Sequence, residues 1–191
     1  MGPLYYGNFM IFLNLILILT LLFIVLFLSL FLLTPLFSKI PFVPVRKKVL
    51  NDIISALELS DKSVLYDLGC GDGRILFSAH KLNPNARYVG IEIAPFPFFW
   101  AKARKFFNRS ENVSIVYGDM FKTDISSATD VFLYLFPKIM NSLLPKFEKE
   151  LSPGTRVVSC DFQFSNKKPI KILNLKSNSY QLNRKLFIYE F

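Results

Sequence analysis

The chain has 191 residues, of which 52% are hydrophobic, so one domain of about 150 residues fits beside an appendage, and a second catalytic domain does not. The formal net charge is +9, and every charged side chain follows residue 38, which favours acidic neighbours, anionic lipid head groups before nucleic acid. Two cysteines and one histidine exclude a secreted disulfide framework and a histidine-rich metal centre. We therefore expect a reducing compartment and no metal site.

The N-terminal part of the chain is almost entirely apolar. Residues 1–8 carry no charge, and Phe9 to Phe37 is a nearly continuous run of Leu, Ile, Phe and Val. About 20 helical residues cross a bilayer core, so this run predicts one transmembrane helix (9–37) after a short tail (1–8). The alternative is a cleaved signal peptide, which would have a positive N-terminal region, a shorter apolar run and a small-x-small cleavage site.

Basic residues follow the apolar run at once, at Lys39, Arg46, Lys47 and Lys48. By the positive-inside rule this asymmetry predicts a single-pass protein with its N-terminus outside and its catalytic domain cytoplasmic. We interpret the basic cluster as a topology signal rather than a specific lipid site, because about four charges is the low end for lipid recognition.

Residues 38–59 connect the apolar run to the domain proper, residues 60–191. Prolines interrupt Ile40 to Pro44 and disfavour helix there. Val45 to Leu59 has apolar residues at a period near 3.6, which predicts a helix packed on the sheet as a structural lid.

The domain is organised around Val64 to Gly73. Strand formers end at Asp67, and glycines follow at 69, 71 and 73 before a helical pattern begins. Glycines let the backbone approach a ligand over the carboxyl end of the strand, and the amides of the turn can donate to a carboxylate. The spacing Gly-x-Gly-x-Gly differs from the dinucleotide fingerprint, which disfavours NAD and FAD.

Three further predicted strands end beside this turn. Residues 87–93 contain Glu92 at the strand tip, about 20 residues after the glycines, where a carboxylate can chelate the two hydroxyls of a ribose. Residues 113–117 are followed by Asp119, which suits the exocyclic amine of an adenine, and residues 130–135 form the fourth strand. Four strand ends therefore converge on one nucleoside-sized crevice.

Helical patterns cover residues 73–81, 95–107 and 137–151 and alternate with these strands. The second pattern carries an aromatic stripe, which we expect in the core, with contact to lipid beside a transmembrane anchor as the alternative. Its members are Phe96, Phe98, Phe99, Trp100, Phe106 and Phe107.

The C-terminal part predicts an antiparallel edge. Thr155–Phe162 is the fifth strand, and only Gln163–Pro169 separates it from Ile170–Leu175, which is too short for a helical crossover. We expect an antiparallel meander ending with Lys185–Phe191. The whole pattern predicts an α/β fold: a Rossmann-like open, mostly parallel twisted sheet with helices on both faces and an antiparallel C-terminal edge.

The motifs at the strand ends, Asp67–Gly73, Gly90–Glu92 and Gly118–Asp119, resemble the cofactor motifs of class I S-adenosylmethionine-dependent methyltransferases over residues 64–162. A narrower resemblance is to the small membrane-anchored group whose mitochondrial members are protein-lysine methyltransferases acting on the ATP synthase c subunit and the adenine nucleotide translocase. It is carried by residues 41–44, 72–75, 135–137 and 150–158.

The resemblance implies S-adenosyl-L-methionine as the cofactor and transfer of a methyl group to a protein lysine near the cytoplasmic membrane face. The cofactor-binding residues it implies are Asp67, Gly69, Cys70, Gly71, Glu92, Asp119, Met120 and Leu135. Tyr134, Phe136 and Pro137 are candidate walls of an acceptor pocket or ordinary strand-end packing. Asp161 either orients an amine or is an ordinary strand residue, and no general base is assigned.

Two alternatives stay open. The same reaction can act on a small or lipid-soluble acceptor such as a quinone, or the chain can be a non-catalytic membrane-tethered binding module, because fold does not fix function. A nucleic-acid substrate is disfavoured, since residues 134–137 lack an Asn/Asp-Pro-Pro-Tyr-type motif for a flipped base. Nothing in the sequence predicts an oligomeric state.

Overall fold

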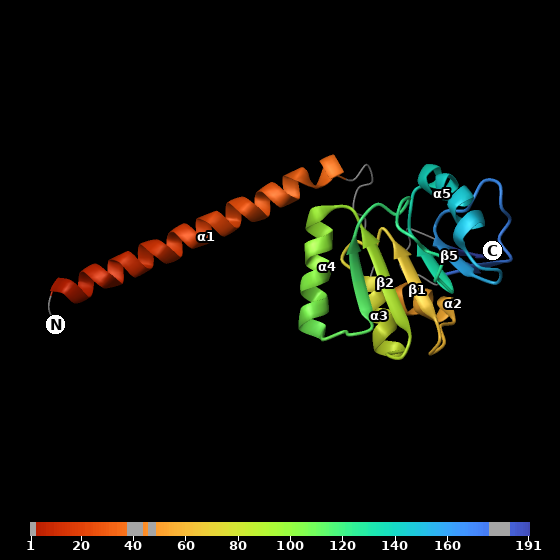
Figure 1. The fold of residues 1–191 in the computed structure, drawn as a ribbon, viewed down its shortest axis with the longest axis horizontal. Coiled ribbons are helices and arrows are strands. Elements are labelled where there is room, and N and C mark those ends of the chain that lie inside the picture. The colour runs from red at the N-terminus through yellow and green to blue at the C-terminus, as the bar shows by residue number, and fades with distance from the viewer. Residues whose placement is uncertain (1–2, 38–43, 46–48, 176–183) are drawn as a thin grey trace.

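The computed structural model describes residues 3–37, 44–45, 49–175 and 184–191. It confirms the predicted α/β architecture: one seven-stranded mixed sheet in the order β3-β2-β1-β4-β5-β7-β6, flanked by helices, with a long separate helix at the N-terminus (Figure 1). The basic residues Lys39, Arg46, Lys47 and Lys48 and most of the proline-rich connector lie outside the described residues.

The elements follow the predicted sequence patterns closely. The strands are β1 Val64–Leu68, β2 Arg87–Glu92, β3 Val113–Tyr117, β4 Asp130–Leu133, β5 Arg156–Cys160, β6 Lys171–Asn174 and β7 Lys185–Glu190. The helices are α1 Pro3–Phe37, α2 Leu50–Leu57, α3 Arg74–Leu82, α4 Pro95–Asn108 and α5 Pro137–Glu150. Strands β1 to β5 pair parallel with one another, so their carboxyl ends meet at one edge of the sheet.

Each central strand buries both of its faces. In β1, Leu65 belongs to the core cluster under α2 and α3, whereas Tyr66 and Leu68 belong to the cluster under α5. Successive side chains of a strand point to opposite faces, so a strand covered on both sides is apolar throughout. All five residues of β1 are buried, including the charged Asp67.

The C-terminal edge differs from the expected meander. Strand β7 pairs antiparallel with β5 on one side and with β6 on the other, with Ile188 opposite both Val158 and Lys171. The prediction that the chain would run in sequence order across this edge is therefore wrong. The reason is burial: the four central residues of β7 are buried, whereas no residue of β6 is, so β6 suits the edge and β7 an interior position.

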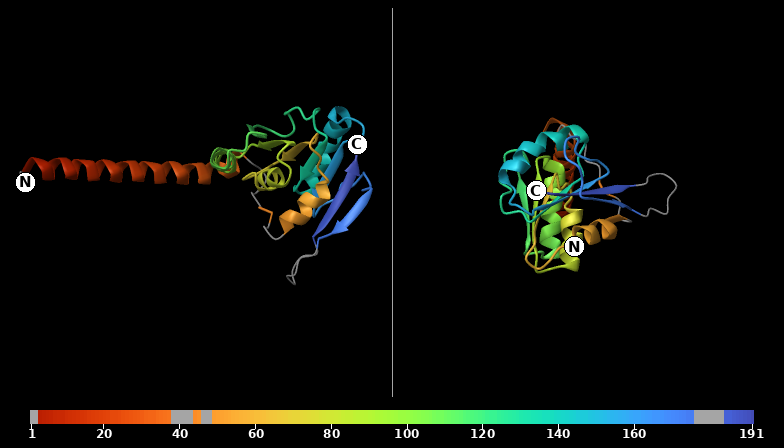
Figure 2. Two further views of the ribbon diagram at one scale, coloured as in Figure 1. Left: turned by 90° about the horizontal axis from the view of Figure 1, so that it is seen from below. Right: turned by 90° about the vertical axis from the view of Figure 1, so that its right-hand side faces the viewer.

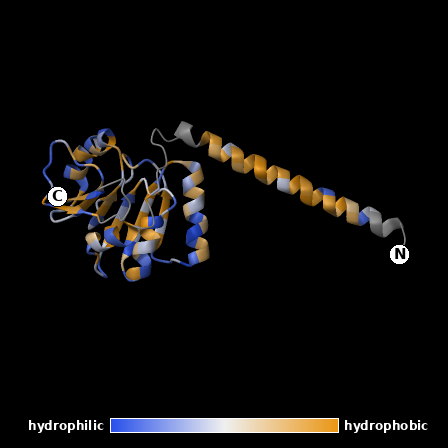
Figure 3. Ribbon diagram, turned by 180° about the vertical axis from the view of Figure 1, so that it is seen from behind, coloured by the Kyte–Doolittle hydropathy of each residue, from blue (hydrophilic) through white to orange (hydrophobic). Residues whose placement is uncertain are grey.

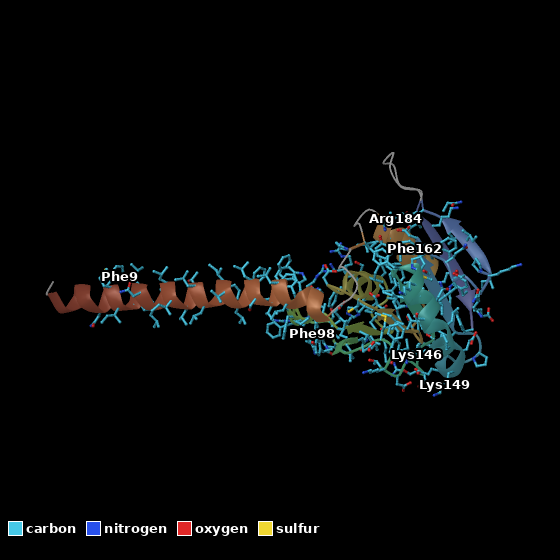
Figure 4. The ribbon with its side chains drawn as sticks, turned by 90° about the horizontal axis from the view of Figure 1, so that it is seen from above. Phe9, Phe98, Lys146, Lys149, Phe162 and Arg184 are labelled. Carbon is cyan, nitrogen blue, oxygen red and sulfur yellow. The ribbon has the colours of Figure 1, made fainter. Side chains whose placement is uncertain are left out.

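Helix α1 stands away from the domain, and Phe9 lies far out on it (Figure 4). Residues Gly7–Leu33 are long and apolar enough to cross a membrane, and none of the most apolar window is buried in the protein. Figure 3 shows α1 as mostly apolar along its length, and most of its large apolar side chains from Phe9 to Leu33 are exposed. This excludes the core helix of a soluble domain, although a signal sequence has the same features.

Helix α4 corrects a second expectation, because most of its aromatic stripe lies outside the core. The buried residues of α4 are Pro95, Pro97 and Ala101, and Phe98 packs against the core cluster. Phe106 and Phe107 are 78% and 80% exposed. The small and proline residues approach the sheet closely, and the remaining aromatic side chains therefore face outward.

Candidate functional site

A cavity of about 320 Å³ lies at the carboxyl ends of the parallel strands, within the range of about 300–1,000 Å³ for small-molecule sites. Nine of the residues proposed from the sequence line it: Asp67, Gly69, Cys70, Gly71, Glu92, Met120, Tyr134, Leu135 and Phe136. Asp119 and Pro137 are not among the lining residues. The fold thus brings the tips of β1, β2 and β4 to one hollow.

Gly69 keeps the floor of this cavity open. Its φ of +78° is left-handed, a conformation that costs other L-residues roughly 1–2 kcal/mol. A Cβ atom on Gly69 would lie 3.3 Å from Cδ2 of Leu135 and 3.5 Å from Cε of Met120, both of which line the cavity. The backbone N–H of Gly69 donates to the carbonyl of Ile91 at 2.9 Å, which ties the turn to β2.

Glu92 joins the tip of β2 to the glycine turn. Its Oε2 accepts a hydrogen bond from the N–H of Gly71 at 2.8 Å, and its Oε1 accepts one from the N–H of Ala94 at 2.8 Å. Burial raises the pKa of Glu92, and the amide hydrogen bonds oppose that shift. Each carboxylate oxygen retains a lone pair for a further donor, such as a hydroxyl.

Asp67 is the most deeply buried acid of the site, with 3% of its surface exposed. Burial raises its pKa well above the ordinary value, and the nearby charges of Glu92 and Asp72 add to the shift. In the part of the chain that the structure describes, no basic side chain hydrogen-bonds to Asp67 or Glu92. No basic side chain among the described residues therefore offsets the repulsion between these two acids by a hydrogen bond, and a cationic ligand would relieve it.

Two arginines neutralise Asp72 instead. Arg74 donates Nε–H to Oδ1 and Nη2–H to Oδ2, both at 2.8 Å, and Arg104 of α4 donates to Oδ2 at 2.9 Å. Arg74 also donates Nη1–H to the carbonyl of Val45 at 2.6 Å, which holds this connector residue at the cavity wall. Asp72 and Arg74 belong to a motif noted in the sequence, but nothing there indicated Arg104.

A second polar group joins Tyr134, which lines the cavity, to Arg184 and Asp161, which are not among the lining residues. Nothing in the sequence indicated that Arg184 would reach Tyr134. Arg184 donates Nη2–H to the hydroxyl of Tyr134 at 3.3 Å, and its guanidinium carbon lies 5.3 Å from the centre of that ring. Arg184 Nη1 is 3.4 Å from Oδ2 of Asp161, and Asp161 has a left-handed φ of +67°. Figure 4 shows Arg184 and Phe162 on the same side of the domain.

Aromatic walls border this polar group. The rings of Phe136 and Phe162 both line the cavity and have centres 5.9 Å apart. Burial raises the pKa of Tyr134, which keeps its phenol neutral. Phe136 is 43% exposed, so the aromatic end of the cavity opens to the surface.

Asp119 has a local role in the structure. Its Oδ1 accepts a hydrogen bond from the N–H of Phe121 at 2.9 Å, which shapes the turn after β3 and sets Met120 against the cavity. Pro137 begins α5. Neither side chain lines the cavity, so the ligand roles suggested for them from the sequence stay predictions.

The donor set fits S-adenosylmethionine. An uncompensated acid at the tip of β1 suits the cationic methionine end, the free lone pairs of Glu92 suit a ribose diol, and Met120 and Leu135 offer apolar contact to a base. A Cβ at Gly69 would enter this space. These residues would hold the cofactor, which when bound supplies an activated methyl group.

Known proteins resemble the chain in this region. Residues 67–171 match the family described as the ANTKMT methyltransferase domain. A protein-lysine N-methyltransferase of Saccharolobus islandicus is 36% identical over 151 residues, which are 78% of this chain and 92% of the relative. The Homo sapiens lysine N-methyltransferase named for the ATP synthase c subunit is 32% identical over 139 residues, 71% of this chain and 58% of that protein.

A solved structure shares the fold. The RNA methyltransferase of Salinibacter ruber, in complex with S-adenosyl-L-homocysteine, superposes with a TM-score of 0.70 at 37% sequence identity. The match covers 78% of this chain and 93% of that one.

Proposed function

The chain belongs to the ANTKMT methyltransferase family and is an S-adenosylmethionine-dependent methyltransferase, and we propose that it is anchored in a membrane and methylates a protein lysine beside the cytoplasmic membrane face. The observation that carries the proposal is the pair of buried acids, Asp67 and Glu92, in a cavity floored by glycine. The relatives named as protein-lysine methyltransferases support the choice of acceptor.

In this proposal the chain binds and orients both reactants. Asp67 accepts from the cationic end of the cofactor, and Glu92 from its ribose hydroxyls. Methyl transfer is an in-line displacement, for which a protein supplies alignment and an uncharged acceptor. A lysine side chain that enters between Phe136 and Phe162 displaces water from this open end, and desolvation lowers the pKa of its amine so that it can lose its proton.

Tyr134 and Arg184 position the acceptor. The hydroxyl oxygen of Tyr134 already accepts a hydrogen bond from Arg184, which fixes the phenol beside the aromatic walls. A phenol held in this way offers its own O–H and a remaining lone pair to an incoming amine. Asp161 forms an ion pair with Arg184 in turn, so in this proposal it acts on the acceptor through Arg184 and Tyr134.

The anchoring part of the proposal depends on α1. Its apolar stretch, Gly7–Leu33, would span the bilayer, and residues 38–59 and 60–191 would form the connector and the catalytic domain. The helix begins at Pro3, so the proposed outer tail of residues 1–8 is mostly helical. The orientation with the N-terminus outside follows from the basic residues after the span.

The binding test compares two variants of the full chain in detergent. Glu92→Ala removes the contact with the Gly71 amide of the glycine turn and the contact with the Ala94 amide before α4, and we expect cofactor binding to fall below detection by calorimetry. Glu148→Ala removes an exposed charge on α5 and should leave binding unchanged. Unaltered binding by Glu92→Ala would exclude this site.

The acceptor test uses membranes from cells lacking the protein, with the purified chain and labelled cofactor. We expect the label on protein lysine, detected as a mass shift of methylation. Label in the lipid fraction would instead establish a quinone or head-group acceptor. Label in RNA would support the activity named for the Salinibacter ruber structure. Cofactor binding without turnover on any fraction would support a tethered binding module.

A further inference from the structure

Helix α4 carries an apolar stripe on its outer face, unlike a helix packed between layers. The stripe recurs at the three- and four-residue spacing of one helix face, and consists of Phe96, Phe99, Trp100, Ala103, Phe106 and Phe107. Trp100 is 53% exposed and Phe107 80%. Contiguous exposed aromatic surface of this kind marks a site of interaction.

The opposite face of α4 is fully used by the domain. Ala101 is buried against the core, and the ring of Phe98 lies 5.1 Å from that of Tyr117 at the end of β3. Arg104 reaches Asp72 in the loop beside the cavity. The rotation of α4 about its axis is therefore fixed, and the stripe cannot turn inward.

The charges of α4 are all basic. The helix contains Lys102, Arg104 and Lys105, with Arg109 directly after it, and no acid. Lys102 and Arg109 are exposed beside the stripe. A helix with Trp and Phe on one face and basic residues beside them has the composition of one that lies in a membrane interface.

The stripe is continuous with the proposed membrane span. The ring of Phe96 lies 5.3 Å from Phe27 and 5.7 Å from Phe31 of α1, both edge to face, and it stacks on Trp100. Figures 1 and 2 show that α4 runs crosswise to α1 and forms the side of the domain toward the length of α1. A helix lying on a bilayer must have this orientation to a helix that crosses it.

We infer that the outer face of α4 is a second membrane contact, which inserts its apolar stripe among the lipids of an anionic bilayer surface while its basic residues meet the head groups. The inference rests on the anchoring part of the proposed function for the orientation of the domain to the bilayer, whereas the contact itself depends on the stripe and its basic neighbours. Pro97 of the same helix lines the cavity. The contact therefore holds the cavity at a fixed height above the membrane, where only lysines close to the bilayer surface can reach it.

Trp100 provides the test, because it is the single tryptophan of the chain. The full chain is reconstituted in phosphatidylcholine–phosphatidylglycerol vesicles, with bromine either absent or on the upper acyl chains. An interfacial helix buries its apolar face by about 5–10 Å, so we expect the brominated lipid to lower Trp100 emission about twofold and aqueous acrylamide to have little effect.

Two variants control the measurement. Phe106→Ser with Phe107→Ser changes the most exposed end of the stripe, and should reduce quenching by the brominated lipid. Ile172→Ser changes an exposed residue of β6, away from α4, and should not. Cofactor binding by each variant reports that the domain is folded.

Resistance to alkaline carbonate extraction separates the two proposals. A chain that resists extraction but whose Trp100 is quenched only by acrylamide would overturn the α4 contact and leave the anchor intact. Shielding from both quenchers, together with cross-linked dimers, would assign the stripe to a second copy and also overturn it. A chain that is extracted would refute the anchor, and quenching by brominated lipid would then still establish the contact made by α4 alone.

Discussion

Replacement of Asp67 by Asn should raise the stability of the ligand-free chain while weakening cofactor binding. The carboxylate is buried, its pKa is raised, and the nearby acids Glu92 and Asp72 repel it. Asn has nearly the same shape without the charge. Folding raises the free energy of this charge by about 1.4 kcal/mol for each pH unit by which the pKa is raised. Removing the charge should raise the unfolding temperature by about 2–4 °C per kcal/mol for a chain of this size.

Cofactor binding should change in the opposite direction. Loss of a charge-assisted hydrogen bond costs about 1.5–3 kcal/mol, so the dissociation constant should rise about 10- to 100-fold. Thermal unfolding with and without cofactor, and calorimetry in one detergent, measure both effects. Glu148→Gln, at an exposed site, controls for the change in net charge. A less stable ligand-free Asp67→Asn, or one that binds with unchanged affinity, would refute the electrostatic argument.

The pH dependence of stability follows from the same group. The folded pKa of Asp67 lies well above 3.8, so the unfolded chain releases its proton first as the pH rises. The free energy of unfolding should therefore fall from about pH 4 upward, until the folded group has ionised as well. Asp67→Asn should make this decline of the unfolding free energy with pH less steep. Burial also raises the pKa values of Glu92 and Asp130, so a smaller decline should remain in the variant. An unchanged slope would contradict the assignment.

Three further outcomes are expected. Gly69→Ala places a Cβ 3.3 Å from Leu135 at a left-handed φ, so the unfolding temperature should fall by about 2–8 °C. Cofactor affinity should fall by about tenfold, equivalent to ~1.4 kcal/mol, and full affinity would show that the cofactor does not approach Gly69. Tyr134→Phe removes the oxygen that accepts a hydrogen bond from Arg184. Turnover should therefore fall about tenfold, with the KM for cofactor unchanged, and normal turnover would exclude a role of Tyr134 in positioning. Cys160 is fully buried, and its pKa is raised to about 12. A maleimide at pH 8 should therefore modify Cys160 only as fast as the domain unfolds. Faster labelling would show local opening of β5.

The sequence alone was sufficient for the elements and for the position of the ligand site. The glycines after Asp67 and the acid at Glu92 are local signals: a left-handed turn requires glycine, and parallel strands end at one edge of their sheet. Hydrophobic periodicity predicted the bounds of each strand and helix of the domain to within a few residues, because the pattern and the element it indicates both depend on residues that are close in the chain.

Only the tertiary structure decided which distant segments meet. Arg184 reaches Tyr134 and Asp161 because β7 lies beside β5, and strand order depends on burial across the whole sheet rather than on local propensity. The stripe of α4 was visible in the sequence, but its direction was not. Hydrophobic residues at helical spacing show that one face of α4 is apolar. The burial of Ala101 and the hydrogen bond from Arg104 to Asp72 determine which face of the helix turns away from the domain.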